Sequence, residues 1–190
     1  MSTRAIASQR APALEAARGS VLELGFGTGL NLSYFPSSVE RLTVVDPEDL
    51  LSHRVEQRIA SAPFPVERAE LSAERLPFED NRFDCAVSTF TLCTIPDAGA
   101  ALAEVRRVLK PGGALLFLEH GLSDEPSVAK WQRRLEPIQM VIGRGCHLTR
   151  RIDQMVSNSG LRISRLDRFL IAGMPKTHAT MYRGAAVADK

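Results

Sequence analysis

The stretch "VLELGFGTGLNL", residues 21–32, gives the first indication of the fold. An apolar run ends at three glycines spaced two residues apart, Gly25, Gly27 and Gly29. Glycine weakens regular structure but tolerates positive φ and lets a ligand lie close to the backbone. A lone glycine loop is a tight strand-to-helix turn about as often as it is a binding loop, so other segments of the chain must decide between the two.

Composition restricts the function classes before any motif does. The chain has 190 residues, 44% hydrophobic and 24% charged, which is typical of one soluble globular domain, predicted to span residues 1–190. A net charge of +2 is too small to indicate a nucleic-acid partner. No run approaches the roughly 18 apolar residues of a transmembrane helix, and no signal peptide is indicated.

Three widely spaced cysteines, Cys85, Cys93 and Cys146, fit a reducing compartment better than a disulfide framework. No CxxC pair is present, so no metal site is expected from the sequence. We therefore predict a cytoplasmic protein without a metal.

Short apolar runs alternate with helical patterns along the chain. Strands are expected over residues 20–25, 41–46, 64–70, 83–90, 114–120, 161–171 and 178–188. Strand and helix in this order predict a parallel sheet covered on both faces. Ligands of such sheets bind beyond the carboxyl ends of the strands, so the residues that follow each strand are the candidates for a site.

The helices between these strands are predicted from spacing and from capping residues. A short helix is expected over residues 12–18, and Pro47 suits the first turn of a second helix. A third ends before Pro111, a fourth is bent or ended by Pro137, and Thr149 is a plausible N-cap for a fifth. Their apolar stripes are Leu51, Val55 and Ile59; Leu102, Val105 and Leu109; Trp131, Leu135 and Ile138; and Ile152, Met155 and Val156.

The spacing of the glycines argues against a dinucleotide. The dinucleotide pattern is Gly-x-Gly-x-x-Gly, and its third glycine would fall on Leu30. Asp46 ends the second strand, where a carboxylate can hold two ribose hydroxyls or cap a helix that begins at Pro47. Glu23 lies inside the first strand and needs a partner, either a structural hydrogen bond or an ammonium group.

Four blocks in order carry a resemblance to a known family: "VLELGFGTG" (21–29), "VVDP" (44–47), "SAERLPFEDNRFDCAVSTFTLCTIPD" (72–97) and "LAEVRRVLKPGGALLFLEH" (102–120). Together they resemble class I S-adenosylmethionine-dependent methyltransferases. The resemblance implies an α/β fold, a Rossmann-like doubly wound seven-stranded sheet that is mostly parallel with an antiparallel last strand. It also implies S-adenosyl-L-methionine as the cofactor.

The same resemblance implies the contacts of the cofactor. Its methionine part is expected near Glu23, Gly25, Gly27 and Gly29, its ribose at Asp46, its adenine near Pro47, Ala73 and Glu74, and its sulfonium near Thr91 and Leu92. Two features depart from the pattern. Relatives often carry an aspartate at the position of Ser72, and they usually have a longer cofactor-covering segment than the short N-terminal segment 1–19.

The C-terminal half resembles one branch of the family, the methyltransferase-like thiol S-methyltransferases. The resemblance rests on "FLEHG" (117–121), on a helix containing Trp131 and on "GCHLTR" (145–150). Residues 121–160 are expected to form a substrate-side helical insertion. Animal relatives have an N-terminal membrane anchor, and none is expected here. The implied reaction is methylation of a small-molecule thiol.

Other functions stay open at this point. The branch also resembles enzymes that methylate nitrogen, oxygen or carbon of phospholipids, quinones or other metabolites. A nicotinamide-dependent oxidoreductase and a non-catalytic subunit with the methyltransferase fold are less favoured.

Methyl transfer from a sulfonium is an in-line displacement, so alignment and exclusion of water should supply much of the rate. A thiol acceptor reacts as its thiolate, and His120 and His147 are the candidate catalytic bases. Each is weighed against an ordinary, hydrogen-bonded histidine.

Cys146 is expected to pack rather than react, because direct displacement needs no covalent intermediate. Glu119 is expected to orient His120 or to cap a neighbouring helix.

The segment from residue 130 to 151 is basic and amphipathic, with six arginines and lysines against the single acid Glu136. Such a segment suits a substrate lid, a peripheral contact with anionic lipid or a homodimer interface. A solvated basic face over a core contact is the more ordinary interpretation.

Overall fold

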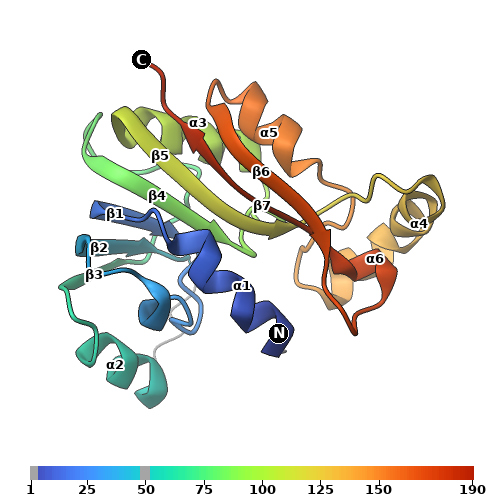
Figure 1. The fold of residues 1–190 in the computed structure, drawn as a ribbon, viewed down its shortest axis with the longest axis horizontal. Coiled ribbons are helices and arrows are strands. Elements are labelled where there is room, and N and C mark those ends of the chain that lie inside the picture. Colours follow the sequence, from blue (N-terminus) through green and yellow to red (C-terminus); the bar gives the residue numbers. More distant parts are fainter. Residues whose placement is uncertain (1–3, 48–51) are drawn as a thin grey trace.

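The structure, a computed structural model, describes residues 4–47 and 52–190. Seven strands form one sheet in the order β3-β2-β1-β4-β5-β7-β6 (Figure 1). Their bounds are β1 Gly19–Leu24, β2 Val39–Val45, β3 Val66–Ala69, β4 Phe83–Thr89, β5 Leu109–His120, β6 Arg162–Leu170 and β7 Thr180–Val187. All seven predicted strands are confirmed.

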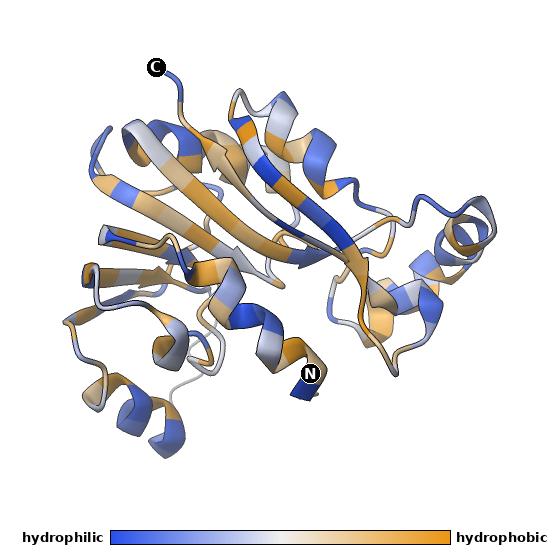
Figure 2. Ribbon diagram, viewed as in Figure 1, coloured by the Kyte–Doolittle hydropathy of each residue, from blue (hydrophilic) through white to orange (hydrophobic). Residues whose placement is uncertain are grey.

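The direction of the strands also follows the prediction. The pairs β1–β2, β1–β4, β2–β3 and β4–β5 are parallel, whereas β7 is antiparallel to both of its neighbours, β5 and β6. The central strands β1, β4 and β5 are buried on both faces, which explains their continuous apolar runs (Figure 2). The edge strand β6 is mostly exposed and carries charges, which discourages pairing with another sheet edge.

Helices cover both faces of this sheet. On one face, α3 (Ala98–Val108) and α5 (Ile152–Asn158) build the larger hydrophobic core with the strands. On the other face lie α1 (Arg4–Leu14), the short 3-10 helix η1 (Leu32–Tyr34) and α2 (His53–Ala60). Helices α4 (Pro126–Ile142) and α6 (Lys176–Ala179) contact each other and extend away from the sheet (Figure 1). The arrangement is doubly wound, as predicted.

Three predictions about helix ends are wrong. The first helix is α1 rather than residues 12–18; it contains Pro12 and buries Ile6 and Leu14. Pro47 does not start a helix, because α2 begins at His53 after its N-cap Ser52. The predicted stripe residue Leu51 lies outside the described residues.

The third error lies at the N-terminus of α5. Its N-cap is Arg151 rather than Thr149, whose hydroxyl instead donates to Glu136 at 2.9 Å. Helix α4 continues through Pro137 to Ile142.

The apolar stripe expected on α4 also differs from the prediction. Trp131 and Ile138 are 55% and 59% exposed, while the helix buries Val128, Ala129 and Gln132. Gln132 takes this position because its side chain bonds three backbone groups, the amide of Ser123 and the carbonyls of Gly121 and Thr177.

Candidate functional site

A cavity of about 590 Å³ lies at the carboxyl ends of β1, β2 and β4. It is lined by the glycine loop after β1, the end of β2, Ser72 and Ala73, and the loop after β4. Arg10 of α1 and Arg144 after α4 complete the lining. This is the sheet edge at which doubly wound folds bind ligands, and the strand order reverses there between β1 and β4.

The glycines of the loop all have positive φ, but each meets different surroundings. A Cβ on Gly25 would lie 2.2 Å from the hydroxyl oxygen of Thr91, so this glycine allows the β1 and β4 loops to touch. A Cβ on Gly27 would meet nothing within 4 Å and would extend into open space at the cavity. The backbone of Gly27 is therefore the part of the loop most open to a ligand.

Glu23 is a buried carboxylate that faces this cavity with one oxygen unpaired. Its Oε1 accepts a hydrogen bond from the side-chain amide of Asn31 at 2.7 Å. Its Oε2 has no hydrogen-bond partner among the described residues. Burial raises the pKa of Glu23 to about 8, against the partial opposition of Asn31 and Arg10. An ammonium group of a ligand would supply the missing partner and favour the ionised carboxylate.

Asp46 is a second acidic residue in the lining of this cavity. It follows β2 and lines the cavity, and its Oδ2 accepts a hydrogen bond from the Gly27 amide at 2.8 Å. Glu23 and Asp46 thus offer two acidic groups along one wall, one suited to an ammonium and one suited to hydroxyls. These are the groups that the methionine and ribose parts of S-adenosylmethionine require.

Arg10 is a lining residue that the sequence did not reveal. It lies on α1, is buried, and donates to the side chains of Asn31 and Thr89. Its guanidinium also lies 5.6 Å from the centre of the Phe90 ring. Nothing in the sequence distinguishes Arg10 from the many other arginines of the chain, because it lies in a helix without a recognised motif. The short N-terminal segment nevertheless contributes to the cavity through this side chain.

The loop after β4 is held in an unusual conformation. Phe90 lines the cavity with φ +57°, a region that bulky residues rarely adopt. Glu119, fully buried on β5, accepts hydrogen bonds from Ser88 Oγ at 2.7 Å and from the amides of Thr91 and Leu92 at 3.0 and 3.1 Å. Burial raises its pKa. Glu119 neither bonds His120 in these contacts nor caps a helix, as the sequence suggested; it fixes this loop.

The "GCHLTR" turn clamps the same loop from the other side. Arg150 donates to the carbonyl oxygens of Leu92, Ile95 and Pro96, and the His147 amide donates to the carbonyl of Cys93 at 2.8 Å. Desolvation lowers the pKa of Arg150, and the charges of Cys93 and Glu119 partly oppose this shift. The turn after α4 and the loop after β4 therefore form one hydrogen-bonded unit.

Glu136 holds this turn in shape. Its carboxylate contacts His147 Nδ1 at 2.7 Å, and it accepts from the Leu148 amide at 2.7 Å and the Thr149 hydroxyl at 2.9 Å. His147 is not among the residues that line the cavity. Its pairing with Glu136 is a structural contact, which weakens the prediction that His147 is a base.

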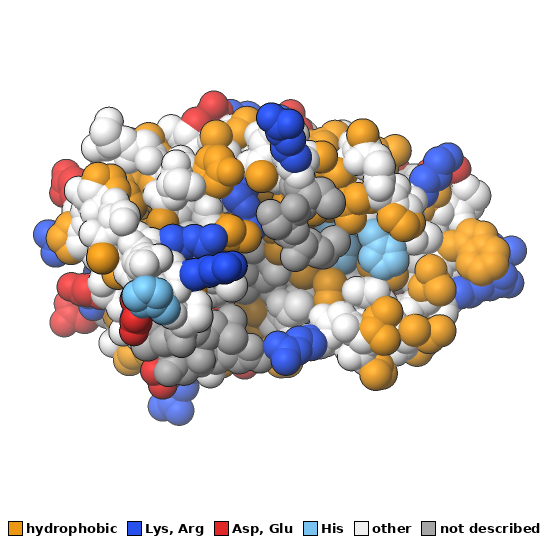
Figure 3. Space-filling view, turned by 90° about the horizontal axis from the view of Figure 1, so that it is seen from below, with side chains coloured by type: hydrophobic (Ala, Val, Ile, Leu, Met, Phe, Trp, Pro, Cys, Tyr) orange, Lys and Arg blue, Asp and Glu red, His pale blue; other side chains and the backbone are white. Residues whose placement is uncertain are grey.

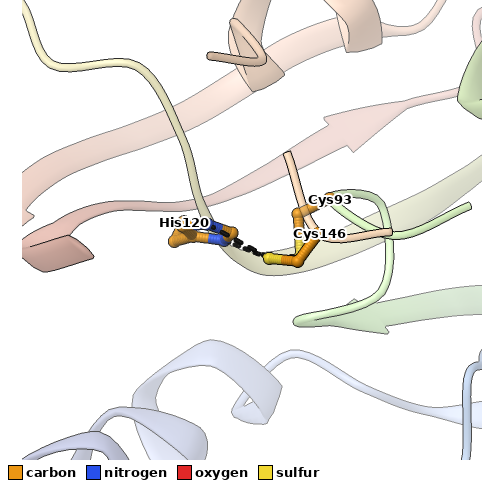
Figure 4. Close-up of side chains that lie close together, drawn as sticks. All are labelled: Cys93, His120 and Cys146. Atoms are coloured by element: carbon orange, nitrogen blue, oxygen red, sulfur yellow. Dashed lines mark hydrogen bonds between the residues drawn. The ribbon is translucent and has the colours of Figure 1, made fainter. Parts of the chain in front are cut away.

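His120 lies in a cluster with two cysteines (Figure 4). The three side chains point toward one another from the end of β5, the loop after β4 and the turn after α4. Cys146 Sγ lies 3.7 Å from Cys93 Sγ and 3.4 Å from His120 Nε2. The hydrogen bond between the two thiols lowers the pKa of Cys146, and the same bond and burial raise the pKa of Cys93. Cys146 therefore has polar partners rather than the packing role expected for it.

The predicted cofactor residues divide into two groups. The cavity is lined by Glu23, Gly25, Gly27, Asp46, Pro47, Ala73 and Thr91. Three predicted cofactor residues are absent from its lining, Gly29, Glu74 and Leu92, and so are both candidate bases, His120 and His147. Leu92 is fully buried in the core, and Glu74 instead bonds Ser72 Oγ and the Asp97 amide. Besides Arg10, the lining residues that the sequence did not single out include Asn31, Phe90 and Arg144.

A second cavity of about 590 Å³ lies between η1 and α2, on the other side of the glycine loop. Gly29 lines this cavity. Its described lining holds Arg54 and Arg58 but no carboxylate, so it offers no partner for an ammonium or for ribose hydroxyls. The first cavity is therefore the candidate cofactor site.

The surface beside the cluster is partly apolar. Trp131, Ile138, Met140, Val141 and Ile142 of α4 are all exposed, Val141 by 80%. Figure 3 shows hydrophobic side chains gathered at the end of the molecule where α4 lies, next to histidine side chains. Among the described residues, no helix has the length and apolar character to cross a membrane.

Comparison with known proteins agrees with this architecture. The family profile described as "Methyltransferase domain" matches residues 22–117. The thiol S-methyltransferase TMT1B of Rattus norvegicus is 38% identical over 141 residues, 69% of this chain and 55% of that protein. The ubiquinone/menaquinone biosynthesis C-methyltransferase UbiE of an Enterobacter species is 34% identical over 146 residues, 74% of this chain and 55% of that protein. The chain thus spans about half the length of these curated relatives.

Solved structures share the whole fold at low sequence identity. The 1,6-didemethyltoxoflavin-N1-methyltransferase of Burkholderia thailandensis, solved with S-adenosylhomocysteine, superposes with a TM-score of 0.70. The match covers 97% of this chain and 79% of that chain, at 19% identity. The likeness confirms the predicted fold class.

Proposed function

Because this chain belongs to the methyltransferase domain family of S-adenosylmethionine-dependent enzymes, we propose that it transfers the methyl group of S-adenosylmethionine to a small-molecule thiol. The observation that carries the proposal is the cavity wall that joins the unpaired oxygen of buried Glu23, the open backbone of Gly27 and the carboxylate of Asp46. This wall suits the ammonium and ribose of that cofactor.

The residues of the wall have separate roles in the proposal. Glu23 binds the ammonium through Oε2, and Asp46 accepts hydrogen bonds from the ribose hydroxyls. Arg10 lies beside Asn31 on the same cavity and offers positive charge to the carboxylate of the methionine part. Ser72 and Ala73 lie at the adenine side. The loop of Phe90 and Thr91 separates the cofactor from the acceptor.

The chemistry then depends on alignment and on ionisation of the acceptor. When bound, the cofactor supplies an electrophilic methyl group on a sulfonium. The chain's own residues hold the methyl donor against the loop after β4 and exclude water, because Glu119 and Arg150 fix that loop from two sides. The Cys93–His120–Cys146 cluster includes one residue of the same loop, Cys93, and in this proposal it lies on the acceptor side.

The preference for a thiol rests on the relatives of the TMT1 group and on this sulfur-rich cluster. A second candidate is methylation of a quinone or phospholipid. The exposed apolar residues of α4 and the UbiE relative favour it, because an apolar acceptor or a membrane surface would dock there. The same surface would suit a homodimer. A nicotinamide-dependent oxidoreductase is disfavoured by the glycine spacing and by the family.

The test is transfer of a labelled methyl group from S-adenosylmethionine to a panel of alkyl thiols, amines, phenols, a quinone precursor and phosphatidylethanolamine vesicles. The proposal expects turnover on thiols with the release of S-adenosylhomocysteine. Transfer only to carbon, nitrogen or oxygen acceptors would contradict the thiol assignment. Lack of S-adenosylhomocysteine binding by calorimetry would contradict the cofactor site itself.

A further inference from the structure

Cys93, His120 and Cys146 come from three separate segments, the loop after β4, the end of β5 and the turn after α4. Their ligand atoms all lie within 4.8 Å of one another (Figure 4). Cys93 and His120 are buried, while Cys146 is partly exposed. The three residues show no metal-binding spacing along the chain, so only the fold brings them together.

The distances fit a tetrahedral zinc centre. Zinc bonds of about 2.3 Å to sulfur and about 2.0 Å to nitrogen place two sulfur ligands roughly 3.8 Å apart, and sulfur and nitrogen ligands roughly 3.6 Å apart. The Cys93 and Cys146 sulfurs are 3.7 Å apart, and Cys146 Sγ lies 3.4 Å from His120 Nε2. The third pair of ligand atoms, from Cys93 and His120, also lies within 4.8 Å.

The ligand set also fits the ion by charge and chemical type. Two thiolates neutralise Zn²⁺, and imidazole adds a neutral ligand, so the complex suits a largely buried place. Sulfur and imidazole select zinc over magnesium or calcium, which prefer oxygen. Three protein ligands leave one tetrahedral position open, which is the mark of a catalytic rather than a structural site.

Hydrogen bonds around the cluster hold its three segments in place. The His147 amide and the Arg150 guanidinium tie the turn of Cys146 to the carbonyls of the loop of Cys93. Glu119, the residue before His120, holds the amides of Thr91 and Leu92. The chain therefore fixes all three ligands relative to one another, as preorganised metal sites require.

We propose that Cys93, His120 and Cys146 bind one Zn²⁺ ion, and that the open fourth position takes the acceptor sulfur; this second part rests on the proposed function. The acceptor thiol loses its proton to solvent and coordinates as thiolate. Its sulfur then forms a bond to the methyl carbon, while the bond from that carbon to the sulfonium breaks and its electron pair stays on the departing sulfur. The products are a thioether and S-adenosylhomocysteine. His120 then acts as a ligand rather than as a base.

The test begins with metal alone. Full-length protein, reduced with a phosphine and freed of metal by chelation, is titrated with Co²⁺ and then with Zn²⁺. The inference expects one equivalent of Co²⁺ bound, with thiolate-to-cobalt charge-transfer absorption that Zn²⁺ displaces. Cys93→Ser and Cys146→Ser should weaken binding beyond the roughly 10–100-fold loss caused by disturbing an outer partner of a ligand. Cys85→Ser, at a buried cysteine of β4 outside the cluster, is the matched control.

The outcomes separate the two proposals. Absence of the thiolate–cobalt absorption, or equal binding by wild type and the Cys93→Ser/Cys146→Ser double variant, would overturn the metal site, even if thiols are methylated. Metal binding with thiol turnover that chelation abolishes and Zn²⁺ restores supports both parts. Metal binding with thiol turnover unchanged by chelation would overturn the acceptor role of the ion. Metal binding without any thiol turnover contradicts the proposed function and, with it, the acceptor role, and leaves the ion site supported.

Discussion

The Gly27 amide donates a hydrogen bond to Asp46 Oδ2 at 2.8 Å, which joins the loop after β1 directly to the end of β2. Two segments that we propose bind different parts of the cofactor are thus held together by the protein itself. The carboxylate is oriented by this bond before any ligand arrives, so less freedom is lost on binding.

Asp46→Ala tests the ribose contact. Removing a charged hydrogen-bond acceptor should weaken S-adenosylhomocysteine binding by about 1.5–3 kcal/mol, roughly 10- to 150-fold. Calorimetric titration measures the change, and Asp46→Asn, which keeps an acceptor oxygen, should lose less. An unchanged dissociation constant in a folded Asp46→Ala variant would exclude the assignment.

Gly25→Ala and Gly27→Ala form a matched pair, because both glycines have positive φ. The new methyl group at Gly25 would collide with Thr91, so thermal unfolding should show a loss of about 1–3 kcal/mol. At Gly27 the methyl group enters open space at the cavity, so the loss of stability should be limited to the positive-φ strain that both variants share, and the loss of cofactor affinity should be larger. Equal losses of stability with equal affinities would contradict this difference.

Glu23→Gln tests the buried carboxylate through pH. The pKa of Glu23 is raised to about 8 in the folded protein, so its contribution to stability is full below about pH 4.5 and is lost as pH rises to about 8. Without ligand, Glu23→Gln should therefore be more stable than wild type above pH 8, with the difference vanishing near pH 4.5. Denaturant unfolding at both pH values measures this.

The same variant should bind the cofactor less tightly, because glutamine offers the ammonium no negative charge. A Glu23→Gln variant whose stability follows wild type at every pH would show that the carboxylate is not destabilised by burial. Unchanged S-adenosylhomocysteine affinity would argue that the ammonium binds elsewhere.

Arg150→Lys tests the clamp on the loop after β4. Lysine keeps the charge but cannot reach the carbonyls of Leu92, Ile95 and Pro96 with one planar group. Leaving these acceptors unsatisfied should cost about 1–3 kcal/mol of stability and lower turnover. Arg151→Lys, whose partner Asp124 is exposed, is the control and should change little. Similar effects of both substitutions would argue against a clamp.

Sequence patterns predicted the sheet well because buried parallel strands leave an uninterrupted local signal, as in "FDCAVSTF" and "ALLFLEH". The glycine loop and Asp46 were found for the same reason, since a tight turn and a strand end are local features. Pro47 misled the prediction of a helix start, because the same residue can occur in the turn that follows a strand. The proposed acceptor side depends on contacts between distant segments: Cys93 and Cys146 are separated by 53 positions and His120 and Cys146 by 26.

Arg10 shows a second limit of the sequence. A buried arginine on an N-terminal helix differs from an exposed one only through the packing of α1 against the sheet. Trp131 shows the opposite case. Its place in a helical apolar stripe predicted a contact with the core, but its side chain is exposed. Periodicity identifies an apolar face but does not say what covers it.

The hydrogen bonds between the "GCHLTR" turn and the loop after β4 have a practical consequence for engineering. A chimera that exchanges only residues 121–160 with those of a relative would import a turn whose arginine must find the backbone carbonyls of a foreign loop. Acceptor preference should therefore transfer between relatives only when residues 90–97 are exchanged together with that segment. The two stretches therefore have to be exchanged as one unit, although more than twenty residues of helix and strand separate them in the chain.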